Sequence, residues 1–453
     1  MKKIILSGLL LASSSLLFSQ LNPAITYWLQ NTTQTGSYYT TGNSTPIGNN
    51  ILVNCQAVQY SSNWVYVTTT GVPAYVTGPF QDGNPSQAQN QNAIFKIPLN
   101  PTQNTGTLTA TTGGNIGIFI NGVALFDYRD GVAWNASTNA LCGGPGNPPC
   151  PGGASAVMSW NRDAVPAEKP GFDCSKGHPA MGNYHHHQNP SAYKLDLNVI
   201  STICDLYDAD GLYAIDSTVH SPLIGYAYDG FPIYGAYGYK NADGTGGITR
   251  IKSGYQLRNI SSRLVWADGT DVPDGPAVST TYPLGYFRED YEFVAHAGQA
   301  DYLDEHNGRF CVTPEYPNGI YCYFATVDAD WNSAYPYVVG PYFYGNKTAS
   351  KVTTIGETVT TYTSTAGIEE QEISAKVFPN PANDLLIVQV NGLNKSNVQV
   401  ELLDLNGRLI TKQTINQGST IGYIDVSTIY AGNYLLRITS TNQVKTIPIV
   451  ISE

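Results

Sequence analysis

Charged side chains are scarce in this chain of 453 residues. The 23 Lys and Arg and the 34 Asp and Glu make up 13 % of it, about half the share usual in soluble domains. The apolar share of 42 % is ordinary, so the chain can build a core and does not have the composition of a disordered protein. The formal net charge is −11, and no run of Lys or Arg interrupts it. No nucleic-acid partner is therefore expected.

Several catalytic motifs are also missing. The sequence has no Gly-rich phosphate loop, no nucleophile elbow and no Ser/His/Asp signature, so nucleotide-dependent and serine-hydrolase functions have no support. Long stretches of Ala, Leu, Glu or Lys are few, whereas 32 Tyr, 45 Gly and 27 Pro are spread along the chain. This balance favours short strands and turns, and it predicts a mainly β protein of two or three domains.

The first twenty residues have the pattern of a signal peptide. Lys2 and Lys3 precede an uncharged apolar run from Ile4 to Phe18. The run is too short for a comfortable membrane span, and no later stretch approaches the roughly 20 apolar residues that a span needs. We therefore expect residues 1–20 to be a signal peptide, no transmembrane span, and a mature protein outside the cytoplasm.

Export places the seven cysteines in an oxidising compartment, where disulfides are the default. All seven lie between Cys55 and Cys322. Cys142 and Cys150 enclose a Gly- and Pro-rich stretch and are the first candidate pair. Cys311 and Cys322 flank a turn and could face each other across a hairpin. Cys174 and Cys204 are the next candidates. Cys55 is left as a free thiol, a metal ligand or an intermolecular bridge.

A change of composition divides the chain near residue 350. The stretch 346–374 is rich in Thr, Val and Ser, and we expect it to be a linker between a β-rich region, 21–345, and a small immunoglobulin-like β-sandwich, 375–453. Six short alternating runs separated by turn residues predict the sandwich. These runs are Leu386–Val390, Val398–Leu405, Arg408–Thr414, Ile421–Val426, Asn433–Ile438 and Lys445–Ile451.

Motifs of this tail resemble the C-terminal sorting domain of the type IX secretion system. They are Val377-Phe378-Pro379-Asn380-Pro381-Ala382-Asn383-Asp384, the Leu403–Arg408 turn, Tyr430-Ala431-Gly432-Asn433-Tyr434, and Lys445 with Ile447-Pro448-Ile449. The resemblance implies a Bacteroidetes-type route through periplasm and outer membrane, handling by the type IX machinery, and a secreted or cell-surface protein. An immunoglobulin-like spacer is the alternative.

Histidines gather in the middle of the chain, where four of the seven lie within residues 178–187. In a strand, His185 and His187 project to the same face with Cα atoms roughly 6.6 Å apart, a spacing at which two imidazoles can share a metal ion. Tyr184 and His186 would face the other side of the strand. A turn can fold His178 back as a third ligand, and His220 is a fourth candidate.

A carboxylate follows in the stretch Gly225–Gly235. Asp229 lies at an expected bend between two short strands. There its carboxylate could cap the turn, or it could act at the histidine site by orienting an imidazole or by binding the metal. Spacing alone favours the capping role.

Further motifs resemble the YHYH-domain family. They are Gly177-His178-Pro179, Gly182–His187, Ser221–Gly235, Leu303–Phe310, and Thr313–Pro317 with Tyr323-Phe324, and they span about Trp134 to Tyr344. The second Tyr of the family is His186 here, at a position that should face away from the proposed metal ligands. The family has no assigned activity, so the resemblance identifies the domain and not its function.

Two other polar stretches are weaker candidates for a functional site. The acidic stretch Asp205–Gly211 fails the calcium-loop pattern at its first and twelfth positions, so a solvated turn is expected. The stretch Leu303–Phe310 contains Asp304, Glu305, His306 and Arg309 and suits either acid–base chemistry or a polar turn.

Two functions remain open on the sequence, beside the alternative of a plain structural β protein whose histidines only form hydrogen bonds. In the first, His185 and His187, with His178 or His220, hold Zn or Cu, and Asp229 is a further ligand or orients one. An open coordination position would then support hydrolysis, or oxidation with copper. In the second, Tyr and Trp form a non-catalytic surface for a glycan or protein ligand, and the histidines are structural or pH-sensitive.

Overall fold

Strands dominate the computed structural model, which describes residues 21–81, 86–152, 157–198, 201–363, 374–391, 397–405, 407–440 and 443–452. The α-helices within these ranges are short: α1 spans Pro23–Thr26 and α2 spans Ala164–Glu168. The mainly β fold predicted from composition is therefore confirmed. The expected signal peptide, residues 1–20, lies outside the described residues.

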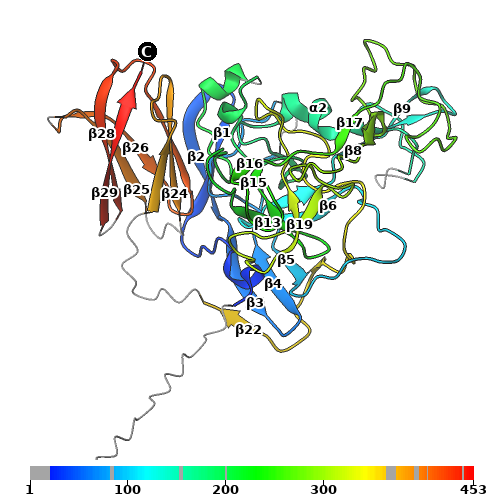
Figure 1. Ribbon diagram of the computed structural model, residues 1–453, viewed down its shortest axis with the longest axis horizontal. Coiled ribbons are helices and arrows are strands. Elements are labelled where there is room, and N and C mark those ends of the chain that lie inside the picture. The colour runs from blue at the N-terminus through cyan, green and yellow to red at the C-terminus, as the bar shows by residue number, and fades with distance from the viewer. Residues whose placement is uncertain are drawn as a thin grey trace, which may run out of the picture.

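A mixed sheet of eight strands forms the centre of the β-rich region (Figure 1), in the order β11-β12-β7-β6-β13-β14-β20-β19. Its strands are β6 (Asn115–Phe119), β7 (Ala124–Phe126), β11 (His178–Ala180), β12 (Asn183–His186), β13 (Leu223–Ala227), β14 (Pro232–Tyr234), β19 (Gly308–Cys311) and β20 (Ile320–Phe324). All residues of β13 and β14 are buried, so both faces of the sheet are covered there. The histidine-rich hairpin β11–β12 forms one edge.

A second sheet has the order β21-β5-β4-β3-β22. Its strands are β3 (Cys55–Tyr60), β4 (Trp64–Thr69), β5 (Ala93–Pro98), β21 (Ser350–Val352) and β22 (Thr360–Tyr362). The last two lie in the stretch expected to be a linker. Their Thr, Val and Tyr residues favour strands, and they pair with β5 and β3 at the two sheet edges. The beginning of that stretch therefore belongs to the β-rich region.

Smaller elements surround these sheets. The remaining strands of the region are β1 (Thr35–Thr40), β2 (Asn43–Leu52), β8 (Arg129–Asn135), β9 (Ala140–Cys142), β10 (Asn161–Asp163), β15 (Tyr237–Tyr239), β16 (Ile248–Arg250), β17 (Tyr255–Leu257) and β18 (Tyr291–Phe293). The 3₁₀ turns are η2 (Lys169–Gly171), η3 (Tyr193–Leu195), η4 (Thr202–Asp205) and η5 (Arg288–Asp290). One large apolar cluster joins strands β15–β18, together with η3 and η4, to the two main sheets. In it Trp28 is fully buried, with its ring 5.5 Å from that of Tyr226.

The C-terminal strands form the predicted two-sheet sandwich, to one side of the β-rich region in Figure 1. One sheet has the order β23-β24-β27 and the other β26-β25-β28-β29. The strands are β23 (Ser374–Phe378), β24 (Leu385–Asn391), β25 (Val398–Leu403), β26 (Leu409–Ile415), β27 (Ile421–Asp425), β28 (Gly432–Ser440) and β29 (Gln443–Ile451). The sandwich has its own apolar core, which includes Leu386, Val400 and Leu436.

The sandwich is also in contact with the acidic turn of the β-rich region. Tyr423 donates its hydroxyl to the backbone carbonyl of Asp210 at 2.9 Å, and Ser419 donates to the Asp210 carboxylate at 3.1 Å. Burial raises the pKa of Asp210 to about 7. The stretch that fails the calcium-loop pattern therefore takes part in an interface within the chain.

Two of the three candidate disulfides are present: Cys142–Cys150 and Cys174–Cys204. The third is wrong, because Cys311 and Cys322 are buried free thiols. The register of β19 and β20 explains the difference. Cys311 lies opposite Ile320, and Cys322 lies opposite Arg309, so the two thiols are diagonal neighbours and not a facing pair. Cys55 is a buried free thiol as well.

The two disulfides should differ in their effect on stability. The Cys174–Cys204 bridge closes a sequence separation of 30 and the Cys142–Cys150 bridge one of 8. In the loop-entropy model, replacing the first pair by Ser lowers the free energy of unfolding by roughly 3.5 kcal/mol and replacing the second by roughly 2.5 kcal/mol. Urea unfolding of the two double variants measures both values. A larger loss for the Cys142–Cys150 variant would contradict the loop-length argument.

Candidate metal centre

A tight hairpin brings His178 beside His185. Strand β11 pairs antiparallel with β12, and these two histidines are directly opposite each other. The connecting residues Met181 and Gly182 both have positive φ, +48° and +82°, as a two-residue type I′ turn requires. Because the turn determines the register, it also determines which side chains of the two strands meet.

Alternation along β12 separates two sets of side chains. His185 and His187 lie on the same side as His178 of β11, whereas Tyr184 and His186 point to the other side. There the hydroxyl of Tyr184 donates to Asp173 at 3.0 Å. His186 hydrogen-bonds the Tyr75 hydroxyl through Nε2 at 2.8 Å and the Lys176 carbonyl through Nδ1 at 3.0 Å. His186 is therefore part of the packing beneath the hairpin.

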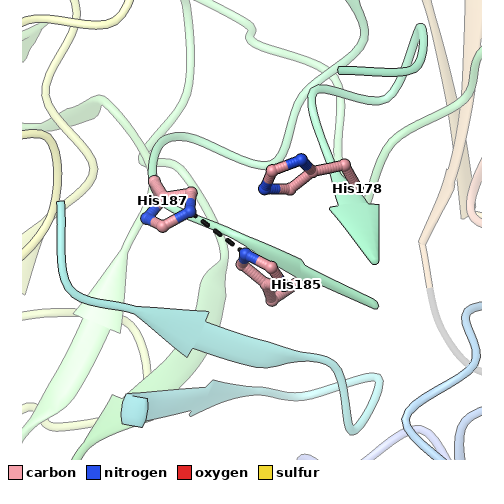
Figure 2. Close-up of side chains that lie close together, drawn as sticks. All are labelled: His178, His185 and His187. Atoms are coloured by element: carbon pink, nitrogen blue, oxygen red, sulfur yellow. Dashed lines mark hydrogen bonds between the residues drawn. The ribbon is translucent and has the colours of Figure 1, made fainter. Parts of the chain in front are cut away.

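Three imidazoles point toward one another above this layer (Figure 2). One ring nitrogen from each of His178, His185 and His187 lies within 4.8 Å of the others, and the Nε2 atoms of His185 and His187 are 3.1 Å apart. The side chains are buried, with exposed fractions of 6 %, 2 % and 4 %. Within the described ranges, the groups of His, Cys, Asp and Glu side chains that are close enough to share an ion all lie around these histidines.

The second nitrogen of two of these rings is held by the backbone. Nδ1 of His185 is 2.9 Å from the Asn183 carbonyl, and Nδ1 of His187 is 2.6 Å from the Asp127 carbonyl. A carbonyl only accepts hydrogen bonds, so each Nδ1 carries a proton, and in the neutral form of either ring Nε2 presents a lone pair. Two lone pairs 3.1 Å apart repel each other unless a positive charge lies between them.

Glu168 is a site residue that the sequence reasoning missed. It ends α2, and its Oε2 atom lies 3.2 Å from Nε2 of His178 and 3.1 Å from Nε2 of His187. Asp163 caps the start of that helix by accepting a hydrogen bond from the backbone N–H of Val165. The helix belongs to no motif shared with the histidines, and a Glu close to His178 in a chain of low charge is the sole hint in the sequence.

Burial and neighbouring side chains lower the pKa of two of these groups, His185 and Glu168. Burial, followed by the charges of His187 and His178, lowers the pKa of His185 well below its usual range. Burial alone would raise the pKa of Glu168, but His178 and His187 outweigh it, so the pKa lies below the ordinary value. Deprotonated imidazole and carboxylate are the forms that bind metals.

An outer layer fixes the rings in place. Phe126 stacks on His185 with ring centres 3.9 Å apart, and Phe172 contacts His178 edge-on at 4.9 Å. Asp127, whose carbonyl faces His187, forms a buried ion pair with Arg129 at 2.7 Å. Such supporting contacts orient metal-binding histidines in proteins.

Comparison with protein families now identifies the domain. The family model described as YHYH protein matches residues 94–337, more than half of the chain. The chain belongs to the YHYH protein family. The motifs identified in the sequence begin at about Trp134, whereas the family match begins at residue 94. The YHYH domain therefore also includes the strands from β5 to β9. No curated protein matches the chain.

The tail has a separate assignment. A model described as secretion system C-terminal sorting domain matches residues 376–452, as the motifs of this segment predicted. The sorting domain implies handling by the type IX secretion machinery and export to the cell surface or the medium. In the described part of the YHYH protein, no helix is long and apolar enough to cross a membrane.

Two of the five expected ligands lie elsewhere in the YHYH domain. His220 hydrogen-bonds the Ser221 carbonyl through Nδ1 at 2.7 Å. Asp229 accepts hydrogen bonds from the Tyr323 hydroxyl at 2.6 Å and the Gly345 N–H at 2.8 Å. Asp229 also accepts a hydrogen bond from the Phe231 N–H at 3.3 Å within the β13–β14 turn, the capping role that spacing favoured. Strands β7 and β6 separate β12 from β13 in the sheet, so this turn is not brought to the histidines.

Asp304 behaves similarly in the other polar stretch of the YHYH domain. Its carboxylate accepts hydrogen bonds from the His306 and Gly308 N–H groups at 2.9 and 3.1 Å and from the Tyr321 hydroxyl at 2.9 Å. These hydrogen bonds stabilise a polar turn before β19.

Asp163, which caps the helix that carries Glu168, should leave a signature in the pH dependence of stability. Asp163 is fully buried and accepts a hydrogen bond from the Tyr337 hydroxyl at 2.6 Å. Burial raises its pKa from 3.8 to about 8. The folded protein therefore keeps a proton that the unfolded chain releases, and this stabilisation is full below about pH 4 and lost as the pH rises to about 8.

Asp163→Asn should remove this dependence while keeping the cap. Between pH 5 and 7 the wild-type free energy of unfolding should lose about 1.4 kcal/mol per pH unit more than that of the variant. Urea unfolding across this range measures both slopes. Asp243→Asn, at an exposed turn, is the control and should follow the wild type. Parallel profiles for Asp163→Asn and wild type would contradict a protonated Asp163.

Proposed function

We propose that this exported YHYH protein binds one divalent metal ion, Zn²⁺ or Cu²⁺, through Nε2 of His178, His185 and His187. The observation that carries the proposal is the pair of Nε2 atoms of His185 and His187, 3.1 Å apart, with both Nδ1 atoms turned outward to backbone carbonyls. This arrangement aims lone pairs at a common point, as in histidine-based metal sites.

A proton is a weaker alternative as the charge between the rings. It bridges one nitrogen pair at a time, and on His178 or His187 it would pair with the Glu168 carboxylate, 3.2 or 3.1 Å away, instead of joining the three rings. Burial disfavours the charged form of His185 in particular. One metal ion, in contrast, interacts with all three rings at once.

The donor set favours borderline divalent ions. Imidazole nitrogens suit Zn²⁺ and Cu²⁺, whereas Mg²⁺ and Ca²⁺ prefer oxygen ligands. Each of the three free cysteines in the described residues is buried, and none belongs to the histidine group. A thiolate-rich site is therefore not the basis of this proposal.

Metal content tests the proposal directly. Protein purified without an affinity tag should contain one equivalent of metal by elemental analysis, and the double variant His185→Ala/His187→Ala should contain none, because two of three ligands are lost. The matched controls are His220→Ala and Asp229→Asn, which change the two expected ligands that lie elsewhere. Both should keep one equivalent. A metal-free wild type that binds neither Zn²⁺ nor Cu²⁺ on addition would refute the site.

Stability with and without metal should depend on pH in a defined direction. The pKa of His185 is lower in the folded than in the unfolded chain, so the unfolded chain takes up a proton first, and stability falls as the pH falls below about 6.5. Protons also compete with the metal for the rings. At 100 times the dissociation constant, Zn²⁺ should add about 2.7 kcal/mol at pH 7.5, and this gain should shrink below pH 6.5.

Thermal unfolding in a pH series, with and without Zn²⁺, measures this effect. The His185→Ala/His187→Ala variant should show no Zn²⁺-dependent rise in unfolding temperature at any pH. An equal rise in the wild type and in this variant would assign the stabilisation to other residues.

A further inference from the structure

Glu168 is a carboxylate in contact with two of the three histidines, and it lies on a different element, α2. Its Oε2 atom is 3.2 Å from Nε2 of His178 and 3.1 Å from Nε2 of His187. We infer that Glu168 is the fourth metal ligand, and that the site is a closed His₃Glu centre with a structural role. This inference rests on the proposed function, since it assumes that the histidines bind a metal.

The Glu168 carboxylate meets the histidine rings at the same ring nitrogens that face one another. Nδ1 of His187 faces the Asp127 carbonyl, so Nε2 is the atom of this ring directed at Glu168 and His185. Oε2 of Glu168 and Nε2 of His185 each lie 3.1 Å from it. Carboxylate oxygen and imidazole nitrogen are both metal donors. One cation at this point would contact all three atoms, whereas a proton on Nε2 serves one partner at a time.

Three of the six distances among the four donor atoms are close to those of tetrahedral coordination. With metal–donor bonds of about 2.0–2.1 Å, neighbouring donors of a tetrahedral zinc site are about 3.3 Å apart. Three contacts approach this value: His185 to His187 at 3.1 Å, His187 to Glu168 at 3.1 Å, and His178 to Glu168 at 3.2 Å. The histidine nitrogens span up to 4.8 Å, so coordination draws rings together by up to about 1.5 Å.

Four protein ligands distinguish a structural from a catalytic site. Structural zinc sites are closed by four side chains, whereas catalytic sites keep one position for water or substrate. Here the histidines are buried and Phe126 and Phe172 cover two of the rings. The exposed fraction of the Glu168 side chain is 23 %, the highest of the four. If a position were open to solvent, it would be the one that Glu168 fills.

The chain around the site explains the need for a structural ion. The three histidines lie within the segment closed by Cys174–Cys204, and Glu168 lies just before it. The described regular structure of this segment is limited to β11, β12, η3 and the start of η4. A metal bound to Glu168 and the histidines joins α2 to the hairpin, and so adds a second cross-link where backbone pairing is sparse.

Cobalt substitution of the full-length protein tests the inference. Co²⁺ bound to the wild type should give the intense visible bands of four-coordinate cobalt, and azide should leave these bands unchanged because no position is open. In Glu168→Gln the affinity for Co²⁺ should fall at least tenfold, and azide should then shift the bands. Glu315→Gln is the matched control. That residue accepts a hydrogen bond from Tyr234 and lies outside the histidine group, so this variant should behave as the wild type.

The outcomes separate the two proposals. Failure of the wild type to bind Co²⁺ or Zn²⁺ would overturn the metal site itself. Binding with an azide-dependent spectrum, or with equal Co²⁺ affinity in Glu168→Gln, would overturn the closed site and leave the histidine site standing. If Glu168→Gln does not fold, Glu168→Asp keeps the charge and shortens the reach, and an affinity equal to wild type in that variant contradicts ligation. The azide titration of the wild type tests the closed site even if no Glu168 variant folds.

Discussion

The register of the hairpin β11–β12 is the constraint on which the candidate site depends. The positive φ angles of Met181 and Gly182 close a two-residue turn, and the turn places His178 opposite His185. Parallel pairing of β12 with β7 then places His185 beside Ala124. A shift of one residue would exchange the two faces of β12, turning Tyr184 and His186 toward Glu168. The contacts among the three histidines of the candidate site therefore follow from this pairing.

Buried polar groups hold the surrounding loops where regular structure is short. Lys176 is fully buried and pairs with Asp196 at 3.0 Å. The Asp173 carboxylate accepts hydrogen bonds from the N–H groups of Gly78, Ser175 and Gly177. A Cβ at Gly177 would lie 2.4 Å from the Tyr184 hydroxyl, so this position admits no side chain. The backbone on both sides of the histidines is thus fixed by polar contacts as well as by packing.

Local and periodic features of the chain could be predicted well. Alternation in the tail indicated the strands of the sandwich, because a half-buried strand repeats every two residues. The same periodicity put His185 and His187 on one face and His186 on the other. The pairing of Cys142 with Cys150 followed from the Gly- and Pro-rich loop between them. The Cys311–Cys322 pair failed because a hairpin turn does not reveal an offset of two residues in the ladder.

The sequence by itself determined the class of the protein: mainly β, with a YHYH domain, a sorting tail for export, and a histidine cluster with the donor chemistry of a metal site. Only the tertiary structure shows which side chains lie beside that cluster. It places Glu168, whose helix meets the hairpin through contacts between distant elements, next to the histidines, and it places His220 and Asp229 beyond strands β7 and β6. The physical reason is that strand period and turn chemistry are local properties of the chain. The order of strands in a sheet depends instead on burying apolar surface across the whole domain.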